Sequence, residues 1–429
     1  MLQSSLFAGT AHLLLHFDEP VAVFQQDATT IQTGDIEVNT LVIKQQDEIV
    51  CLVAVDTLYA STNVRDAVLR LIPSDSGIKA ENLILVASHS HNAPILDDTK
   101  PYLCKCNPAF KDNATQVIAQ TITLALAKME PVSIHFGMNA NNLSINRRGI
   151  TWGRTGVIPV RKFKMIPNPN GPVDQLLRSW QLRNGSGQHI AFIWNFGCHP
   201  VAYPKANAIH PDYVGDVRSQ LRKTIGKDLP VLFFPGFLGN IRPALFGKPT
   251  NLKDLFYFAA HGQIFKKPNI AGYTDWCQKL FESLRKSIDN SQELLVDGLK
   301  MTKTTVALKT LLKSPLPGSL ELFALSGLGK QVFMMASAEV LVEYESLLKP
   351  HLELTDETIV PIGCINSVFG YLPVDKQLKE GGYEVDLFMP WFSLGGNEFY
   401  DHIEHEVIDP WVAIARRSRE PQAIKEQNG

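Results

Sequence analysis

Residues 84–94 read Ile-Leu-Val-Ala-Ser-His-Ser-His-Asn-Ala-Pro, so an apolar, strand-forming run stops abruptly at two histidines. A buried strand that ends in polar, ligand-capable residues is typical of the sheet edge where α/β proteins place their chemistry. Because side chains alternate along an extended segment, we expect His89 and His91 on the same side. Two neutral imidazoles on one side would make half of a metal site, and two solvated loop histidines are the alternative interpretation.

Strand-like and helical patterns alternate through the rest of the chain. The apolar, strand-like runs lie at residues 50–56, 83–88, 189–196, 230–234, 303–309, 320–325, 330–336 and 359–365. The helical patterns lie between them, at 63–73, 112–129, 212–225, 273–287 and 339–349. This alternation predicts an α/β protein with mixed β-sheets flanked by helices. We expect one domain over residues 1–416, long loops at 97–111 and 244–272, and a flexible, charged tail over 417–429.

The charge, the apolar runs and the cysteines of the chain bear on its partners and on its compartment. The formal net charge of −2 and the 20% of charged residues give no electrostatic reason to expect nucleic acid or an anionic membrane. No apolar run approaches the roughly 20 residues that span a bilayer, and the N-terminus lacks the pattern of a signal peptide. The six cysteines are scattered, which predicts a reduced, cytoplasmic protein.

Polar clusters follow several of the strand-like runs. They are Asp56, residues 197–200 with His199, residues 235–243, residues 337–339 with Glu339, and Asn366 followed by Tyr371. Each could be an ordinary polar loop residue. Five or six strands that end in such residues are harder to explain in that way, because hydrolytic metal sites are assembled from the ends of different strands.

The ligand types in these clusters fit one another. A catalytic zinc takes about three protein ligands of the His, Glu or Asp kind and keeps one position for water. His89, His199 and Glu339 are such a set, and the phenol of Tyr371 could complete it. Zinc lowers the pKa of a bound water toward about 7, and His91 could then hold or shuttle a proton.

An ordered set of motifs over about residues 50–390 carries a family resemblance. The motifs are Ser-His-Ser-His-Asn-Ala-Pro at 88–94, Ile-Asn-Arg-Arg at 145–148, Cys-His-Pro at 198–200 with Asp-Tyr-Val-Gly at 212–215, Gly-Asn-Ile-Arg-Pro at 239–243, Ala338-Glu339, and Tyr371 with Tyr383. In this set the chain resembles the catalytic domain of the neutral/alkaline, non-lysosomal ceramidases, which are zinc amidases that cleave the amide of ceramide. The resemblance implies that residues 1–416 form one metal-hydrolase catalytic domain.

The resemblance also implies roles for individual residues. One Zn²⁺ per chain would be held by four ligands, His89, His199, Glu339 and Tyr371. His91 and Tyr383 match residues that flank the reacting carbonyl and stabilise or protonate the tetrahedral intermediate, and Arg147 matches an arginine beside the catalytic centre. The implied reaction is hydrolysis of a linear amide by attack of a zinc-bound water.

The chain departs from the family at one position that bears on the substrate. The family carries a serine in a Gly-Asp-Val-Ser-Pro-Asn segment, and Arg242 stands at the corresponding place here. Arg242 could clamp a carboxylate or phosphate, and we assign Arg148 and Asn240 to substrate binding beside it. The expected partner is a small-molecule N-acyl or ester substrate, smaller or more anionic than ceramide. The family's usual signal peptide and C-terminal immunoglobulin-like domain are not expected in this chain.

Several alternatives remain open at this point. A catalytically inactive relative could bind a ligand or metal without turnover, and an esterase or lactonase could use the same metal site. Asp56 is either a carboxylate that orients the histidine pair or a strand-end cap. Asp212 either orients His199 or caps the helix that follows it.

The segment 401–406, Asp-His-Ile-Glu-His-Glu, is interpreted as a solvated helix face rather than as a metal site, because its spacing is not His-Glu-x-x-His. The oligomeric state is left open.

Overall fold

The largest element of the fold is a mixed β-sheet. The computed structural model describes residues 5–155, 158–247, 252, 255–256, 263–314 and 316–420. In this part of the chain nine strands form one sheet, in the order β10-β9-β8-β5-β1-β2-β3-β4, with β14 paired to β5. The strands are β1 (Phe7–Leu14), β2 (Glu37–Gln45), β3 (Glu48–Val55), β4 (Leu83–Ala87), β5 (Glu130–Ala140), β8 (Leu176–Asn184), β9 (His189–Phe196), β10 (Val231–Pro235) and β14 (Gln292–Glu293).

A second, four-stranded sheet packs against the first. Its strands run in the order β15 (Val296–Ala307), β16 (Ser319–Leu328), β17 (Gln331–Ala336) and β19 (Ile359–Ile362). One apolar cluster joins the facing sides of the two sheets, with Leu52, Trp180 and Phe234 from the large sheet and Phe323 and Phe333 from the small one. The core between the sheets holds their strand ends in fixed relative positions.

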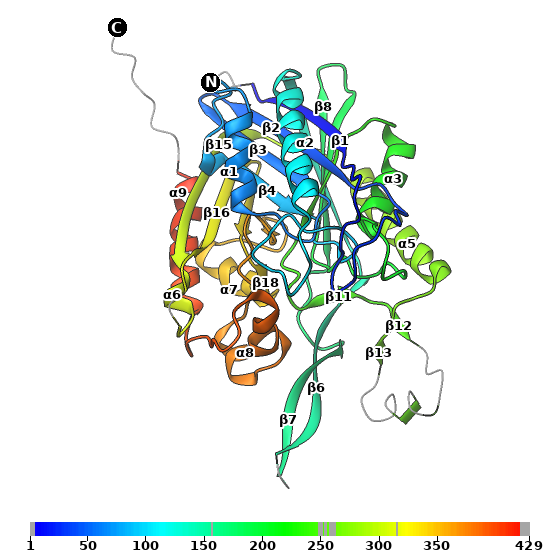
Figure 1. Cartoon of the computed structure of the whole chain (residues 1–429). Helices are drawn as coiled ribbons and strands as arrows, with labels where there is room; N and C mark the ends of the chain where they lie inside the picture. Colours follow the sequence, from blue (N-terminus) through cyan, green and yellow to red (C-terminus); the bar gives the residue numbers. More distant parts are fainter. Residues whose placement is uncertain are drawn as a thin grey trace.

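Helices cover the outer faces of both sheets, so the fold has four layers (Figure 1). The large sheet is covered by α1 (Thr62–Leu71), α2 (Pro108–Leu126), α3 (Tyr213–Ile225) and α5 (Ile270–Asp289). The small sheet is covered by α7 (Glu343–Leu352) and α9 (Glu404–Ser418). Shorter helical segments are η1 (Ala80–Asn82), α6 (Leu308–Leu311), α8 (Asp375–Glu380), η2 (Tyr383–Leu387) and η3 (Met389–Phe392).

Short strand pairs lie at one end of the sandwich. The hairpin of β6 (Ser144–Thr155) and β7 (Ile158–Asn168) projects from the body there, and β11 (Ile241–Pro243) pairs with its base (Figure 1). Two further pairs are β12 (Phe246–Gly247) with β13 (Ile264–Phe265), and β18 (Glu339–Val340) with β20 (Tyr371–Leu372). These pairs bring segments from distant parts of the sequence to the ends of β4 and β9.

The predicted fold class, mixed β-sheets flanked by helices, is confirmed. The expected helix at 339–349 is wrong at its start: Glu339–Val340 forms β18, and the helix begins at Glu343. The expected loop at 97–111 ends earlier, because α2 begins at Pro108. The loop at 244–272 falls partly outside the described residues. The same holds for the tail, of which residues 417 and 418 still belong to α9.

Two further observations concern the chain as a whole. The six cysteines, all of them described residues, are free thiols, and the reduced, cytoplasmic state stays a prediction. Among the helices of the described residues, none combines the length and apolar character needed to cross a bilayer. The single domain over 1–416 stays a prediction.

Candidate metal centre

Three histidines from two strand ends meet at the same place. Their ligand-capable nitrogen atoms all lie within 4.8 Å of one another. His89 and His91 follow β4, and His199 follows β9; His89 and His199 are buried, whereas His91 is half-buried. The ring centroids of His89 and His199 are 5.1 Å apart, and those of His89 and His91 are 5.2 Å apart. This group could hold a metal ion, and it includes His91, which the sequence had assigned to proton transfer.

His89 reaches this position through an unusual backbone conformation. Its φ is 62°, in the left-handed region that residues other than glycine rarely adopt. The chain therefore leaves the extended conformation at His89, and the expected alternation of side chains is not what brings the two histidines together. A strained backbone held in place by surrounding structure is common at functional sites. Here the His89 N–H donates to the carbonyl of Thr57 (3.0 Å), which holds the turn.

Hydrogen bonds fix the tautomers of two of the histidines. Nδ1 of His89 lies 3.1 Å from the Leu58 carbonyl, and Nδ1 of His199 lies 2.8 Å from the Ile241 carbonyl. Because a carbonyl oxygen can only accept, each Nδ1 carries a proton, and each ring in its neutral form presents a lone pair at Nε2. A backbone carbonyl behind the ring is the usual partner of a metal-binding histidine.

The two lone pairs face the carboxylate of Glu339. Its Oε2 lies 2.9 Å from Nε2 of His199 and 3.5 Å from Nε2 of His89. Burial, followed by the charge of Arg147, lowers the pKa of His199 to about 4, so its ring is neutral at pH 7. Burial raises the pKa of Glu339, but His89 and His199, when their rings are protonated, hold it well below its usual range. A carboxylate and two imidazole lone pairs at such distances repel unless a cation lies between them, so this donor set fits a metal ion.

Two phenols surround the same carboxylate. The hydroxyl of Tyr59 donates a short hydrogen bond to Oε1 of Glu339. Tyr371 is the register partner of Glu339 in the parallel β18–β20 pair, which places the two residues side by side. Burial, and then the charge of Glu339, raises the pKa of each phenol well above its ordinary value. Both phenols are therefore protonated in the metal-free protein.

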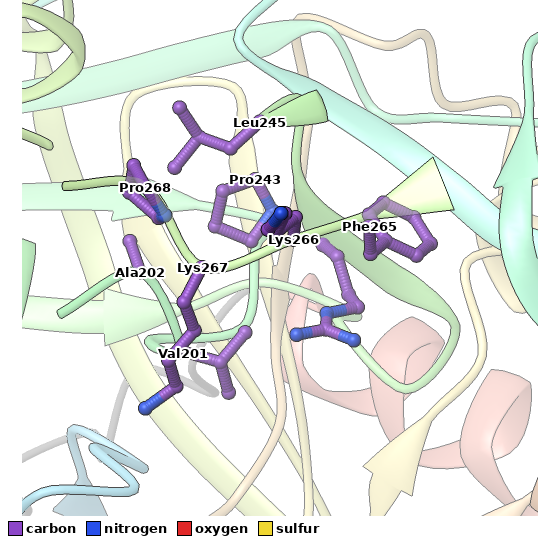
Figure 2. A pocket seen from close by; sticks show the side chains of 9 residues that line it. Val201, Ala202, Pro243, Leu245, Phe265, Lys266, Lys267 and Pro268 are labelled. Carbon is purple, nitrogen blue, oxygen red and sulfur yellow. The ribbon is translucent and has the colours of Figure 1, made fainter. Parts of the chain in front are cut away.

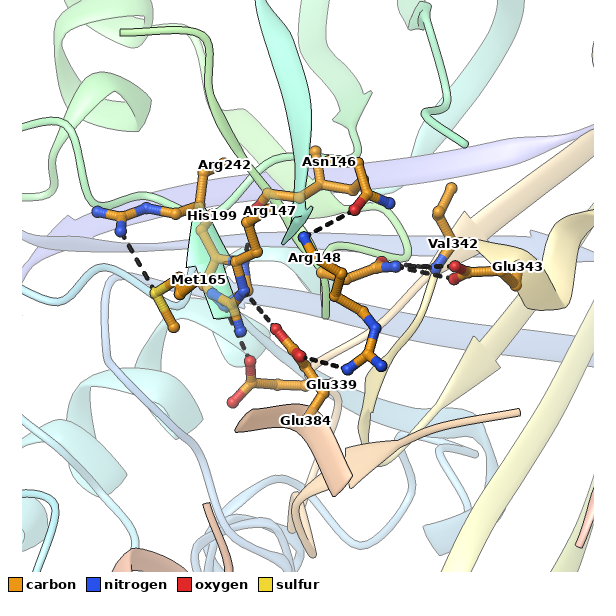
Figure 3. Close-up of polar contacts among 12 residues, drawn as sticks. Asn146, Arg147, Arg148, Met165, His199, Arg242, Glu339, Val342, Glu343 and Glu384 are labelled. Atoms are coloured by element: carbon orange, nitrogen blue, oxygen red, sulfur yellow. Dashed lines mark hydrogen bonds and ion pairs between the residues drawn. The ribbon is translucent and has the colours of Figure 1, made fainter. Parts of the chain in front are cut away.

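Arg147 and Tyr383 also belong to the candidate metal centre, where Arg147 contacts His199 and the rings of both Tyr371 and Tyr383. Nη1 of Arg147 lies 3.4 Å from Nε2 of His199, and its Nε donates to Oε1 of Glu384 (2.8 Å). The guanidinium lies 5.5 Å from the ring centre of Tyr371 and 5.6 Å from that of Tyr383. Figure 3 shows Arg147 between His199 and Glu384. Tyr383 and Glu384 belong to η2, a π-helical turn of a kind that is frequent at functional sites.

Two of the predicted substrate-binding residues are engaged in other contacts. Arg148 is buried and donates to Glu384 (2.8 Å), to Glu380 (3.2 Å) and to the Gly381 carbonyl (2.9 Å). Asn240, also buried, donates to Glu343 at the start of α7 and accepts from the Val342 N–H. These contacts hold neighbouring segments together (Figure 3), and the assignment of both residues to substrate binding stays a prediction.

The two aspartates lie away from the histidine rings. Asp56 accepts from the Glu37 N–H (3.0 Å) and from Arg218 (2.6 Å), so it ties the end of β3 to α3. Asp212 accepts from the N–H groups of Tyr203 (2.8 Å) and Tyr213 (2.6 Å) as the N-cap of α3. Backbone carbonyls, and not these carboxylates, accept from Nδ1 of His89 and of His199.

The polar segment at 401–406 contributes nothing to this centre. His402 contacts Asp375 (3.1 Å) and His405 contacts Glu406 (3.1 Å), and both histidine side chains are exposed. This agrees with a solvated helix start.

Comparisons with known proteins place the fold. Neither a family model nor a curated protein sequence matches the chain significantly. Among solved structures, neutral ceramidase from Pseudomonas aeruginosa superposes with a TM-score of 0.75 at 15% identity, over 98% of this chain and 76% of that one. The chain has the fold of neutral ceramidase. A ceramidase complexed with C2 also superposes, with a TM-score of 0.72 at 13% identity and the same coverage.

The ceramidase-like fold confirms the resemblance that the ordered motifs had indicated. Sequence reasoning missed two residues of the centre, Tyr59 and Glu384. Tyr59 lies in an apolar stretch, and its partner Glu339 is 280 positions away. Glu384 directly follows Tyr383, but its partners Arg147 and Arg148 are 237 and 236 positions away, so the local sequence carried no signal for it.

Proposed function

We propose that the chain is a zinc-dependent hydrolase that cleaves a linear amide (N-acyl) bond. The substrate is smaller or more anionic than ceramide. The observation that carries the proposal is the convergence of two oriented imidazole lone pairs on the ionised carboxylate of Glu339. The ceramidase-like fold supports the reaction class.

The proposed site has three assigned metal ligands and two candidates for the fourth. His89, His199 and Glu339 would hold the ion, with Tyr371 as the further ligand beside them. His91, whose nitrogen also lies within the 4.8 Å group, is the competing fourth ligand. Bound zinc would lower the pKa of a coordinated water toward about 7 and polarise the substrate carbonyl.

The residues around the ligands supply the remaining chemistry. Burial, and then the neighbouring histidines, lowers the pKa of His91 well below its ordinary value, so its ring is neutral. His91 would hold or pass on a proton only transiently during the reaction. The phenol of Tyr383 and the guanidinium of Arg147 would donate to the oxygen on which negative charge develops. Glu384 holds Arg147 in this orientation through the 2.8 Å bond to Nε.

Metal analysis of a histidine variant tests the proposal. We expect about one zinc per purified wild-type chain and hydrolysis of at least one N-acyl amide. His89→Ala should lose both, because it removes one of the lone pairs that would hold the ion. His402→Ala, which changes an exposed histidine outside the centre, is the matched control and should keep both. Zinc content and activity that are equal in the two variants would contradict the ligand assignment.

A substrate panel separates the proposed reaction from its alternatives. Amides, esters and lactones with the same acyl group are compared on the zinc-loaded protein. Faster turnover of the amide supports the proposal, whereas turnover of esters or lactones alone assigns the centre to the esterase or lactonase alternative. Bound zinc without turnover of any of them assigns the protein to the class of inactive relatives.

A further inference from the structure

Arg242 differs from the buried arginines of the protein in its partners. Each of those side chains is ion-paired with a carboxylate; they are Arg65, Arg147, Arg148, Arg178 and Arg218. Arg242 is half-buried, and among the described residues its guanidinium contacts only the sulfur of Met165 (3.5 Å) and the ring face of Phe265 (4.8 Å to the ring centre). A partly buried cation that meets no carboxylate among the described residues is costly, so an anionic group beside Arg242 would be stabilising.

Arg242 lies next to the candidate metal centre. Ile241, whose carbonyl orients His199, directly precedes it in β11. Figure 3 shows Arg242 beside His199 and Arg147. Burial lowers the pKa of both Arg242 and His91. In addition, the positive charge of Arg147 lowers the pKa of Arg242, and that of Arg242 lowers the pKa of His91. Two like charges at this range repel, and an anion between or beside them would relieve the repulsion.

A second cation lines the same small pocket. Lys267 and Arg242 both line it, together with Val201, Pro243 and Phe265. Figure 2 shows Lys267 on the Val201 side of the pocket and Phe265 on the other side. No hydrogen bond or ion pair holds the Lys267 ammonium within the described part of the chain. Asp212 acts on it electrostatically, but both oxygens of Asp212 already accept from backbone N–H groups.

The pocket between these residues is small. Its enclosed space is about 20 Å³, which is room for about one water molecule. An oxygen atom of a carboxylate or phosphate can occupy that space while the rest of the group lies at the open side of the pocket. Val201, which lines the pocket, follows His199 by two residues, so one wall of the pocket belongs to the loop that carries a proposed metal ligand.

We propose that Arg242 and Lys267 form an anion subsite that binds a carboxylate or phosphate group of the substrate beside the metal centre. This assignment of a substrate class rests on the proposed hydrolase function. A guanidinium with one face on Phe265 keeps its N–H groups for bidentate contact with either anion, and the ammonium adds a point charge.

Binding of small anions tests the subsite without any turnover. Calorimetry with inorganic phosphate and with succinate is performed on the full-length, zinc-loaded protein. Arg242→Met keeps the length of the side chain and its packing on Phe265 but removes the charge. We expect it to weaken binding of the preferred anion by about tenfold or more, and Arg242→Lys to weaken it less. Lys330→Met, in the exposed turn between β16 and β17, is the matched control and should bind like the wild type.

Three substrates, together with the two anions, show whether the subsite prefers a carboxylate or a phosphate. N-octanoylethanolamine, N-octanoylglycine and N-octanoyl-O-phosphoethanolamine differ in carrying a hydroxyl, a carboxylate or a phosphate. We expect the wild type to favour an anionic member by about tenfold in kcat/KM, mainly through KM, and Arg242→Met to lose that preference. The favoured member identifies the group.

The outcomes separate this subsite from the hydrolase function. Arg242-dependent anion binding in a protein that holds no zinc or cleaves no amide supports the subsite and rejects the function. Amide hydrolysis with anion binding that is absent, or equal in wild type and Arg242→Met, overturns the subsite and leaves the function standing.

Discussion

Glu339 is the residue on which the contacts of the candidate metal centre converge. His89 and His199 approach one carboxylate oxygen, and Tyr59 donates to the other. The sequence predicted Glu339 and the histidines, because each comes directly after an apolar run and is of a ligand-capable type. It could not predict Tyr59, because nothing local distinguishes a buried phenol that meets a distant carboxylate from an ordinary core tyrosine.

Removal of the Tyr59 hydroxyl tests how far it supports the carboxylate. We expect Tyr59→Phe to weaken zinc binding by about 10–100-fold, as the loss of groups that orient metal ligands commonly does. Competition with a chelator measures the affinity. Tyr344→Phe is the control, since that buried phenol donates to the Pro373 carbonyl (3.1 Å) and does not contact Glu339. Both variants should lose about 1–2 kcal/mol of stability; equal zinc affinities in the two would refute the role of Tyr59.

At the scale of elements, the short pair β18–β20 positions two of the predicted ligands. The sequence pattern around residues 339–349 favoured a helix. The short strand at its start was missed because Glu339 pairs with Tyr371, 32 positions away, and a two-residue strand is too short to show an alternating pattern in the sequence. The α/β class was predictable, since the long apolar strands carry it. The β6–β7 hairpin and the pairing of β11 with it were not, although they place Arg147 and Arg242 at the centre.

Gly239 provides a test of how tightly β18 is held. A Cβ at this position would lie 2.6 Å from the carbonyl oxygen of Glu339 and 2.9 Å from that of Val340. We expect Gly239→Ala to displace β18, to cost about 1–3 kcal/mol of stability and to weaken zinc binding. Thermal unfolding and chelator competition measure the two effects. Gly185→Ala is the control, because a Cβ there would meet nothing within 4 Å; a Gly239→Ala protein with wild-type zinc affinity would show that β18 tolerates the shift.

At the scale of the whole molecule, the metal centre joins segments from all parts of the fold. Its residues follow β4 and β9 of the large sheet and lie in the β18–β20 pair beside the small one. A bound ion would therefore link elements that otherwise meet only through the apolar core. Because a ligand that binds only the folded state stabilises it, zinc should raise the unfolding free energy of the entire chain.

Chelation provides the test at this scale. At a free zinc concentration about 100 times the dissociation constant, binding contributes about 2.7 kcal/mol, so removal by EDTA should lower Tm by several degrees. His89→Ala should unfold near the chelated wild type and should not respond to EDTA, since the site is already disrupted. His402→Ala should respond like the wild type. An equal EDTA shift in His89→Ala and wild type would mean that the stabilising ion lies elsewhere in the protein, and an unshifted wild type would mean that the centre does not connect these elements through a metal.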